Sequence, residues 1–179
     1  MPNPYQKLYF SSDWAVVPPP TIPVKPQDGQ RMAVYVPSTG SKGLEGRLFP
    51  PGGFGAGPNN LINAYHFNAR SLFTFCDNGS EDANVLCTIT ATGYRMDPEK
   101  HTESLKATQQ FVQPPCQGYR NCATQQIWLN SEFVELSTLA FEARVGEKSK
   151  MLFVDTVAME WWNNTCAASQ LRKARPRLG

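Results

Sequence analysis

The segment Asn84-Val-Leu-Cys-Thr-Ile-Thr-Ala-Thr-Gly-Tyr94 alternates with the two-residue period of a β-strand. One set of side chains is small or apolar and runs from Val85 through Ile89 to Gly93, whereas the other set is rich in threonine. β-Branched residues suit such an extended, half-buried surface. The segment therefore predicts a strand with one face against a core and a threonine-rich face outside.

Other stretches with strand character lie on both sides of this segment. In the stretch 64–75, aromatic and apolar residues keep a two-residue spacing whose phase slips near Arg70 and Ser71, which predicts a bend or bulge. The remaining candidates are 31–36, 107–112, 124–129, 133–143 and 150–162. Strands separated by turns, without helices between them, predict an all-β domain built as an antiparallel sandwich or barrel.

The chain of 179 residues is long enough for one core, and its composition does not divide it into two units. Residues 1–30 are rich in proline and predict an extended strap, part of which packs on the domain because it carries several aromatic side chains. Residues 31–166 form the predicted β-domain. Residues 167–179 are expected to be a frayed basic tail that contains Arg172, Lys173, Arg175 and Arg177.

The stretch Phe49-Pro-Pro-Gly-Gly-Phe-Gly-Ala-Gly-Pro58 predicts a long loop. Proline and glycine interrupt both helices and strand ladders, so regular structure is not expected here. The aromatic side chains Phe49 and Phe54 favour a loop that packs against the sheet.

Several weak signals together favour a secreted protein. The chain has five cysteines and two glycosylation sequons, at Asn78 and Asn163. It lacks the basic start and apolar region of a secretion signal, and no apolar run approaches the roughly 20 residues that span a bilayer. The formal net charge of +2 is too small to indicate a nucleic-acid partner.

The cysteine spacing predicts two local disulfides. Cys76 and Cys87 end and begin successive strand candidates, and Cys116 and Cys122 enclose a short loop. Cys166 is left over, which indicates a partner outside this segment or a different connectivity. A zinc site is not favoured, because neither cysteine pair has the spacing of a ligand pair and no histidine lies in ligand spacing with a cysteine.

Asp155 is the candidate for a metal or hydrogen-bonding role, because it interrupts the apolar stretch 151–159. A carboxylate in such a strand needs a hydrogen-bond donor, a cation or an exposed edge position. A structural Ca²⁺ is the one cofactor considered. The acidic loop after Cys76 also carries oxygen ligands, but a solvated hairpin tip is the simpler interpretation.

Exposed aromatic rings beside amide side chains are typical of sugar-binding surfaces, since the ring stacks on the apolar face of a pyranose and the amides reach its hydroxyls. Trp161 and Trp162 are adjacent, so in a strand they point to opposite sides and one can be exposed. The candidate ligand-binding residues are Tyr94, Tyr119, Trp128, Trp162, Gln125, Gln126 and Asn163. The alternative is that these rings pack in the core or under loops.

Common catalytic motifs are missing from the sequence. There is no G-x-S-x-G elbow and no phosphate-binding glycine loop followed by lysine. A pair of carboxylates for glycoside hydrolysis could come from Glu132, Glu135, Glu142 and Glu160, but nothing in the sequence selects two of them.

About residues 45–166 resemble fungal extracellular domains of the carbohydrate-binding-module type. The stretches that carry the resemblance are Leu48-Phe-Pro-Pro-Gly-Gly-Phe54, Phe67-Asn-Ala-Arg-Ser-Leu-Phe73, Thr88-Ile-Thr-Ala-Thr-Gly-Tyr94, Leu136-Ser-Thr-Leu-Ala-Phe141, Phe153-Val-Asp-Thr-Val157 and the run from Trp161 to Cys166. The resemblance implies a jelly-roll sandwich and a secreted or cell-wall location.

The sequence thus predicts a non-catalytic, disulfide-stapled binding or adhesion module whose partner is a carbohydrate or a cell-wall surface. Two alternatives stay open. The first is a small glycan-active enzyme that uses two of the strand glutamates. The second is a structural spacer domain of a larger secreted protein.

Overall fold

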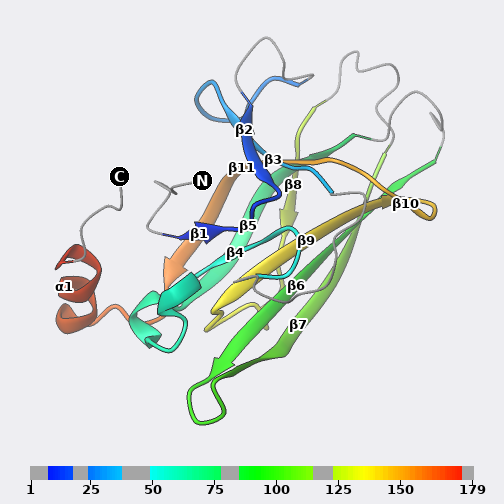
Figure 1. Ribbon diagram of the computed structural model, residues 1–179. Helices are drawn as coiled ribbons and strands as arrows, with labels where there is room; N and C mark the ends of the chain where they lie inside the picture. Colours follow the sequence, from blue (N-terminus) through cyan, green and yellow to red (C-terminus); the bar gives the residue numbers. More distant parts are fainter. Residues whose placement is uncertain (1–7, 18–23, 38–48, 78–84, 115–122, 175–179) are drawn as a thin grey trace.

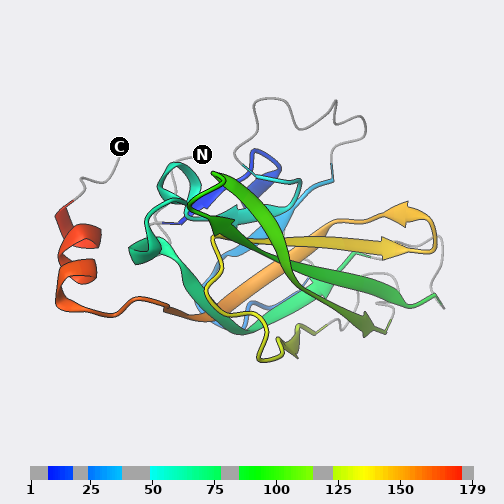
Figure 2. The ribbon, with the colours of Figure 1, turned by 90° about the horizontal axis from the view of Figure 1, so that it is seen from below.

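The computed structural model describes residues 8–17, 24–37, 49–77, 85–114 and 123–174, and these form two antiparallel sheets packed face to face (Figures 1 and 2). Sheet A has the order β1-β4-β9-β6-β7, with β10 paired to β9. Sheet B has the order β2-β3-β11-β5-β8. The predicted all-β sandwich is therefore confirmed.

The strands of sheet A are β1 (Tyr9–Phe10), β4 (Gly53–Gly55), β6 (Cys87–Asp97), β7 (Thr102–Gln113), β9 (Thr138–Val145) and β10 (Lys148–Ser149). Those of sheet B are β2 (Trp14–Val17), β3 (Met32–Tyr35), β5 (Phe67–Cys76), β8 (Gln125–Trp128) and β11 (Leu152–Trp161). The helical elements are the 3₁₀ turns η1 (Gly57–Asn59) and η2 (Asn63–Tyr65) and the helix α1 (Cys166–Ala174).

The order of the strands gives the jelly-roll topology that the resemblance implies. Apart from the strap strands β1 and β2 and the short β10, sheet B reads β3-β11-β5-β8 and sheet A reads β4-β9-β6-β7. The first strand of each set lies beside a strand from the C-terminal part of the chain. The connections therefore cross repeatedly between the sheets, as in a double Greek key.

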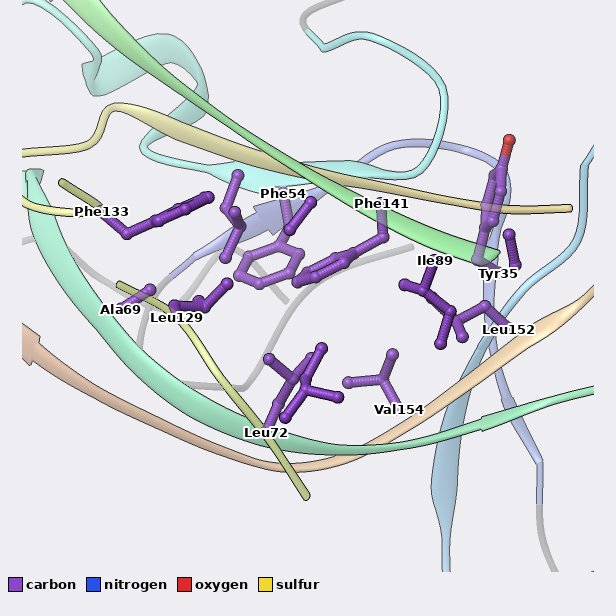
Figure 3. Packing of buried hydrophobic residues seen from close by; sticks show 14 of the residues in the cluster. Tyr35, Phe54, Ala69, Leu72, Ile89, Leu129, Phe133, Phe141, Leu152 and Val154 are labelled. Atoms are coloured by element: carbon purple, nitrogen blue, oxygen red, sulfur yellow. The ribbon is translucent and has the colours of Figure 1, made fainter. Parts of the chain in front are cut away.

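The core lies between the sheets, and the alternation of β6 decides which of its residues enter it. Cys87, Ile89 and Ala91 are buried, while the threonines between them lie on the outer face of sheet A. Figure 3 shows the aromatic centre of this core, in which the ring of Phe54 stacks on Phe141 at a centroid distance of 6.2 Å. The Cys76–Cys87 disulfide joins β5 to β6 and is confirmed.

The glycine- and proline-rich stretch 49–58 contains a strand, so the prediction of a loop without regular structure is wrong there. β4 pairs with both β1 and β9, and Phe54 is 2% exposed. Its glycines allow the backbone to approach β9 closely. A Cβ at Gly55 would lie 2.1 Å from the carbonyl oxygen of Ser137, and one at Gly52 (φ +69°) would lie 2.2 Å from that of Phe141.

The proline-rich strap is part of the sandwich, in line with its aromatic content. β2 pairs with β3, and Trp14 is buried beside Tyr35. Further along, Val24 covers a second apolar cluster on the outer face of sheet B, which contains Met32, Val34, Phe75 and Phe153.

Asp155 fastens this strap to sheet B. Its Oδ2 accepts hydrogen bonds from the backbone N–H groups of Gln27 and Asp28, at 2.7 and 3.1 Å. The hydrogen-bonded role considered from the sequence therefore accounts for this carboxylate. A structural Ca²⁺ at Asp155 stays a prediction, and the described residues contain no group of three or more side chains that could hold a metal ion.

The C-terminal residues form the helix α1 up to Ala174, so the expectation of a frayed tail is wrong for this part. Ala168 packs against Ala64 and Tyr65 beside η2. Arg172 is buried, donates a hydrogen bond to the carbonyl oxygen of Asn163 at 2.9 Å, and has its pKa lowered by burial. Arg172, which the sequence placed in a frayed basic tail, instead donates to the backbone carbonyls of Ala64 and Asn163.

Some sequence predictions concern residues that the structure does not describe. Cys116 and Cys122, the second predicted disulfide, lie outside the described residues, as does the sequon at Asn78. Cys166 is an exposed free thiol at the start of α1. Within the described part of the chain, no helix has the length and apolar character needed to cross a membrane.

The close approach of β4 to β9 predicts a large difference between two glycine substitutions. Gly55→Ala should lower the free energy of unfolding by about 3 kcal/mol, because the new Cβ overlaps a backbone carbonyl that cannot rotate away. Gly146→Ala should cost only about 1 kcal/mol, since that residue needs a left-handed backbone but has open space around it. Urea denaturation measures both, and equal losses would contradict the observed packing of β4.

Candidate functional site

Two exposed tryptophans lie on the outer face of sheet B. Trp128 on β8 is 64% exposed and pairs with Ser71 on β5. The next pair, Ile127 with Leu72, is buried in the core. Because side chains alternate along a strand, Trp128 and Ser71 point away from the core.

Trp162 lies on the same face, one residue beyond β11. Its N–H donates to the carbonyl oxygen of His66 at 2.9 Å, which continues the pairing of β11 with β5. Its neighbour Trp161 packs against the core, with the guanidinium of Arg172 4.9 Å from the ring centroid. Because side chains alternate along the strand, Trp162 lies on the outer face of sheet B, on the same side as Glu160, and is 46% exposed.

Small and polar side chains occupy the surface between the two rings. Ser71 and Ala158 are paired across β5 and β11, next to Trp128. Two residue pairs further along the strands, on the same face, Asn68 is paired with Glu160. We call this surface the tryptophan face, and it consists of Gln126, Trp128, Ser71, Arg70, Asn68, Glu135, Ala158, Glu160 and Trp162.

Glu135 completes the row that contains Asn68 and Glu160. The bridge between Phe67 and Leu136 continues the edge of β5 beyond β8, so Glu135 is the neighbour of Asn68 on the outer side. The Oδ1 atom of Asn68 accepts a hydrogen bond from the Glu135 N–H at 2.9 Å. Its Nδ2 atom donates to Glu160 Oε1 at 3.0 Å.

Each carboxylate of this row is neutralised by an arginine. Arg70 forms an ion pair with Glu160, and Arg95 Nη2 lies 2.9 Å from Glu135 Oε1. The hydrogen bond from Asn68, and then the hydrogen bond and charge of Arg70, lower the pKa of Glu160. Glu160 is therefore an ionised acceptor at neutral pH, and the row as a whole carries little net charge.

The two rings are far enough apart to contact different parts of one extended ligand. Trp128 and Trp162 are separated by two strand positions across the sheet and about four residues along it, which corresponds to roughly 17 Å between their Cα atoms. A ligand that touches both rings must be longer than one sugar unit. The groups between the rings can hydrogen-bond along its length.

The sequence candidates are distributed over different surfaces. Gln126 lies on the tryptophan face and donates to Ser71 Oγ at 3.2 Å, whereas the preceding Gln125 alternates to the other side. Tyr94 is on the outer face of sheet A, where burial and the charge of Glu103 raise its pKa. Tyr119 lies outside the described residues.

Asn163 is engaged within the protein. Its Nδ2 donates to Asn63 Oδ1 at 3.0 Å, and its Oδ1 accepts from the Thr165 hydroxyl at 2.9 Å. The side chain thus holds the segment after Trp162 against η2. Glycosylation at this sequon stays a prediction, as does the role of Asn163 in ligand binding.

Two of the four candidate glutamates lie together, and Glu132 is not one of them, because it lies in the exposed turn after Asn130. Glu142 lies on sheet A and is paired with Arg144, so it cannot face Glu160 across a common groove. Glu135 and Glu160 share the tryptophan face with Asn68 between them. Their Cα atoms are two strand positions apart, or roughly 10 Å.

The sequence reasoning did not identify Ser71, Asn68, Arg70 or Ala158 as site residues. Each is an ordinary strand residue in the sequence, and only the register of β5 with β8 and β11 places it between the tryptophans. The phase slip at Arg70 was the available signal, because it marks where the outward-facing set of β5 changes.

A family model described as a domain of unknown function, DUF7371, matches residues 1–172. No curated protein matches the chain.

The depressed pKa of Glu160 predicts a local pH dependence. Its folded-state pKa lies below its unfolded value, so its stabilising contribution is present at neutral pH and is lost as the pH falls through the depressed pKa. A carboxyl ¹³C NMR titration should place the Glu160 midpoint below that of an ordinary glutamate. Arg70→Met should raise this midpoint, and Arg144→Met, on the other sheet, should leave it unchanged. A wild-type midpoint at the ordinary value would contradict the Asn68 and Arg70 contacts.

Proposed function

We propose that this chain, which belongs to the DUF7371 family of domains of unknown function, is a binding module that holds an extended, neutral carbohydrate on the tryptophan face. The observation that carries the proposal is the placement of two exposed tryptophans on one side of sheet B, with hydrogen-bonding groups between them.

The chemistry of this face fits a sugar chain. An indole ring offers a flat apolar surface on which the C–H face of a pyranose can stack. Between the rings, the amide of Gln126 and the Arg70–Glu160 pair supply donors and acceptors for hydroxyl groups. Because the charges of the row compensate one another, a charged ligand would have to displace an existing ion pair, whereas a neutral one would not.

The proposed location is extracellular, on or near a fungal cell wall, with an adhesin-like role. The Cys76–Cys87 disulfide supports an oxidising compartment, since such bonds are rare in reducing cytosol. The resemblance to fungal extracellular domains supports the cell wall as the source of the ligand.

Replacing the exposed rings should weaken binding without unfolding the protein. Trp128→Ala and Trp162→Ala should each lower the affinity for a bound polysaccharide at least tenfold, because each removes a stacking surface worth about 2 kcal/mol in a binding hot spot. Depletion assays against insoluble β-glucan, chitin and mannan identify the polysaccharide that binds. The affinity of each variant is then measured on that polysaccharide.

Tyr94→Ala provides the matched control, since it removes an aromatic ring from the opposite sheet. This variant should bind like wild type, and thermal unfolding should show that both tryptophan variants remain folded. A loss of binding in Tyr94→Ala alone, or wild-type binding by both tryptophan variants, would place the ligand elsewhere.

The glycan-active alternative has one specific observation in its favour, the shared face of Glu135 and Glu160. Their Cα separation of roughly 10 Å would allow the two carboxyl groups to reach the distance of about 6.5 to 9.5 Å found in inverting enzymes. The lowered pKa of Glu160 would suit a general base, and Glu135 is the second carboxyl on the same face. Release of reducing ends from the bound polysaccharide, abolished by Glu160→Gln with binding retained, would establish this activity in place of simple binding.

A further inference from the structure

A pocket of about 400 Å³ opens at the end of the sandwich, beside the tryptophan face. It lies between the segment that carries η1 and η2 and the end of β6. The volume is within the range of small-ligand sites. The residues that line it are Asn60, Leu61, Ile62, Asn63, His66, Arg95, Met96, Pro98 and Glu135.

The lining combines apolar groups with amides. Leu61, Met96 and Pro98 contribute apolar surface, and Leu61 remains 46% exposed at the rim. Asn60 and Asn63 contribute amide side chains. The C–H face of a sugar is flat and suits a ring, whereas this concave lining suits a small projecting apolar group beside a polar one, such as a methyl joined to an amide.

The charges in the pocket are already paired. Arg95 and Glu135 form their ion pair across its wall. An acidic ligand would compete with Glu135 for Arg95, and a basic one would compete with Arg95 for Glu135. A neutral ligand can instead hydrogen-bond to both while the pair stays intact.

Several contacts hold the pocket in shape before any ligand arrives. His66 is 5% exposed, and its Nε2 donates to the carbonyl oxygen of Asn60 at 2.6 Å. Its Nδ1 has no hydrogen-bond partner among the described residues. Glu135 has a left-handed backbone (φ +57°), which is uncommon for a residue with a side chain and is held here by Asn68.

We propose that this pocket receives one N-acetylated sugar unit of the carbohydrate that lies on the tryptophan face. Glu135 belongs to both surfaces, so a chain that crosses the row of Asn68 and Glu160 leads directly to the pocket. The acetamido methyl contacts Leu61 and Met96, and the amide bonds to the polar lining. This inference rests on the proposed function and specifies the sugar that it prefers.

Isothermal titration calorimetry with two tetrasaccharides tests the pocket. The probes are β-1,4-linked N-acetylglucosamine and β-1,4-linked glucose tetramers, which share a backbone and differ in the acetamido groups. Wild type should bind the N-acetylated tetramer at least tenfold more tightly. Leu61→Trp, which fills the rim with a bulky ring, should abolish this preference and keep the affinity for the glucose tetramer.

Val112→Trp is the matched control, because Val112 is 57% exposed on sheet A and pairs with Thr88, at the opposite end of β6 from Arg95 and Met96. It should behave like wild type with both probes. Equal binding of the two tetramers by wild type, or an unchanged preference in Leu61→Trp, would overturn the pocket assignment.

Trp128→Ala separates this proposal from the proposed function. If Trp128→Ala weakens the binding of both tetramers and Leu61→Trp keeps the preference, the tryptophan face is supported as the binding surface and the pocket assignment is rejected. If wild type binds neither tetramer, both proposals are rejected for this class of sugar.

Discussion

The pairing of β5 with β11 decides which side chains form the core and which form the outer surface of sheet B. β11 contains one additional residue between Asp155 and Ala158, and β5 contains one between Ser71 and Ala69. The register therefore shifts by one residue and then returns. These two bulges change the phase of both strands together. Phe67 and Ala69 thereby enter the core, although Phe73 and Phe75, at the same spacing, face outward.

The same phase change creates the site. Without it, Asn68 and Glu160 would face the core, where an ionised carboxylate is costly, and Trp161 would face solvent. With it, the polar row lies outside between Trp128 and Trp162, while Trp161 packs against the core and Arg172. One irregularity thus links the stability of the sandwich to the surface from which we infer its function.

The sequence predicted the parts of the fold that depend on local alternation. The threonine-rich face of β6, the phase slip at Arg70 and the Cys76–Cys87 pairing follow from side-chain period and spacing within one or two segments. β4 was missed because glycine and proline disfavour strands in general, and only the close contact with Ser137 and Phe141 explains why glycine is needed there. Tertiary contacts outweighed local propensity at this strand.

The candidate site was predictable only in part. Exposed tryptophans could be proposed from their positions in strands, but Arg95, Asn68 and Glu135 come from three distant segments that meet through sheet register. The structure also separates Tyr94 from the tryptophans by placing it on sheet A. The distribution of residues between two sheets depends on topology, which a single sequence does not display.

The most direct measurement of the central claim is an NMR titration of the indole N–H signals. The chain has four tryptophans, of which Trp14 and Trp161 pack against the core while Trp128 and Trp162 are exposed on the tryptophan face. Addition of a soluble oligosaccharide from the polysaccharide that binds should shift the signals of Trp128 and Trp162 and leave that of Trp14 in place. Shifts confined to residues on the outer face of sheet A, with both exposed indoles unchanged, would contradict the account.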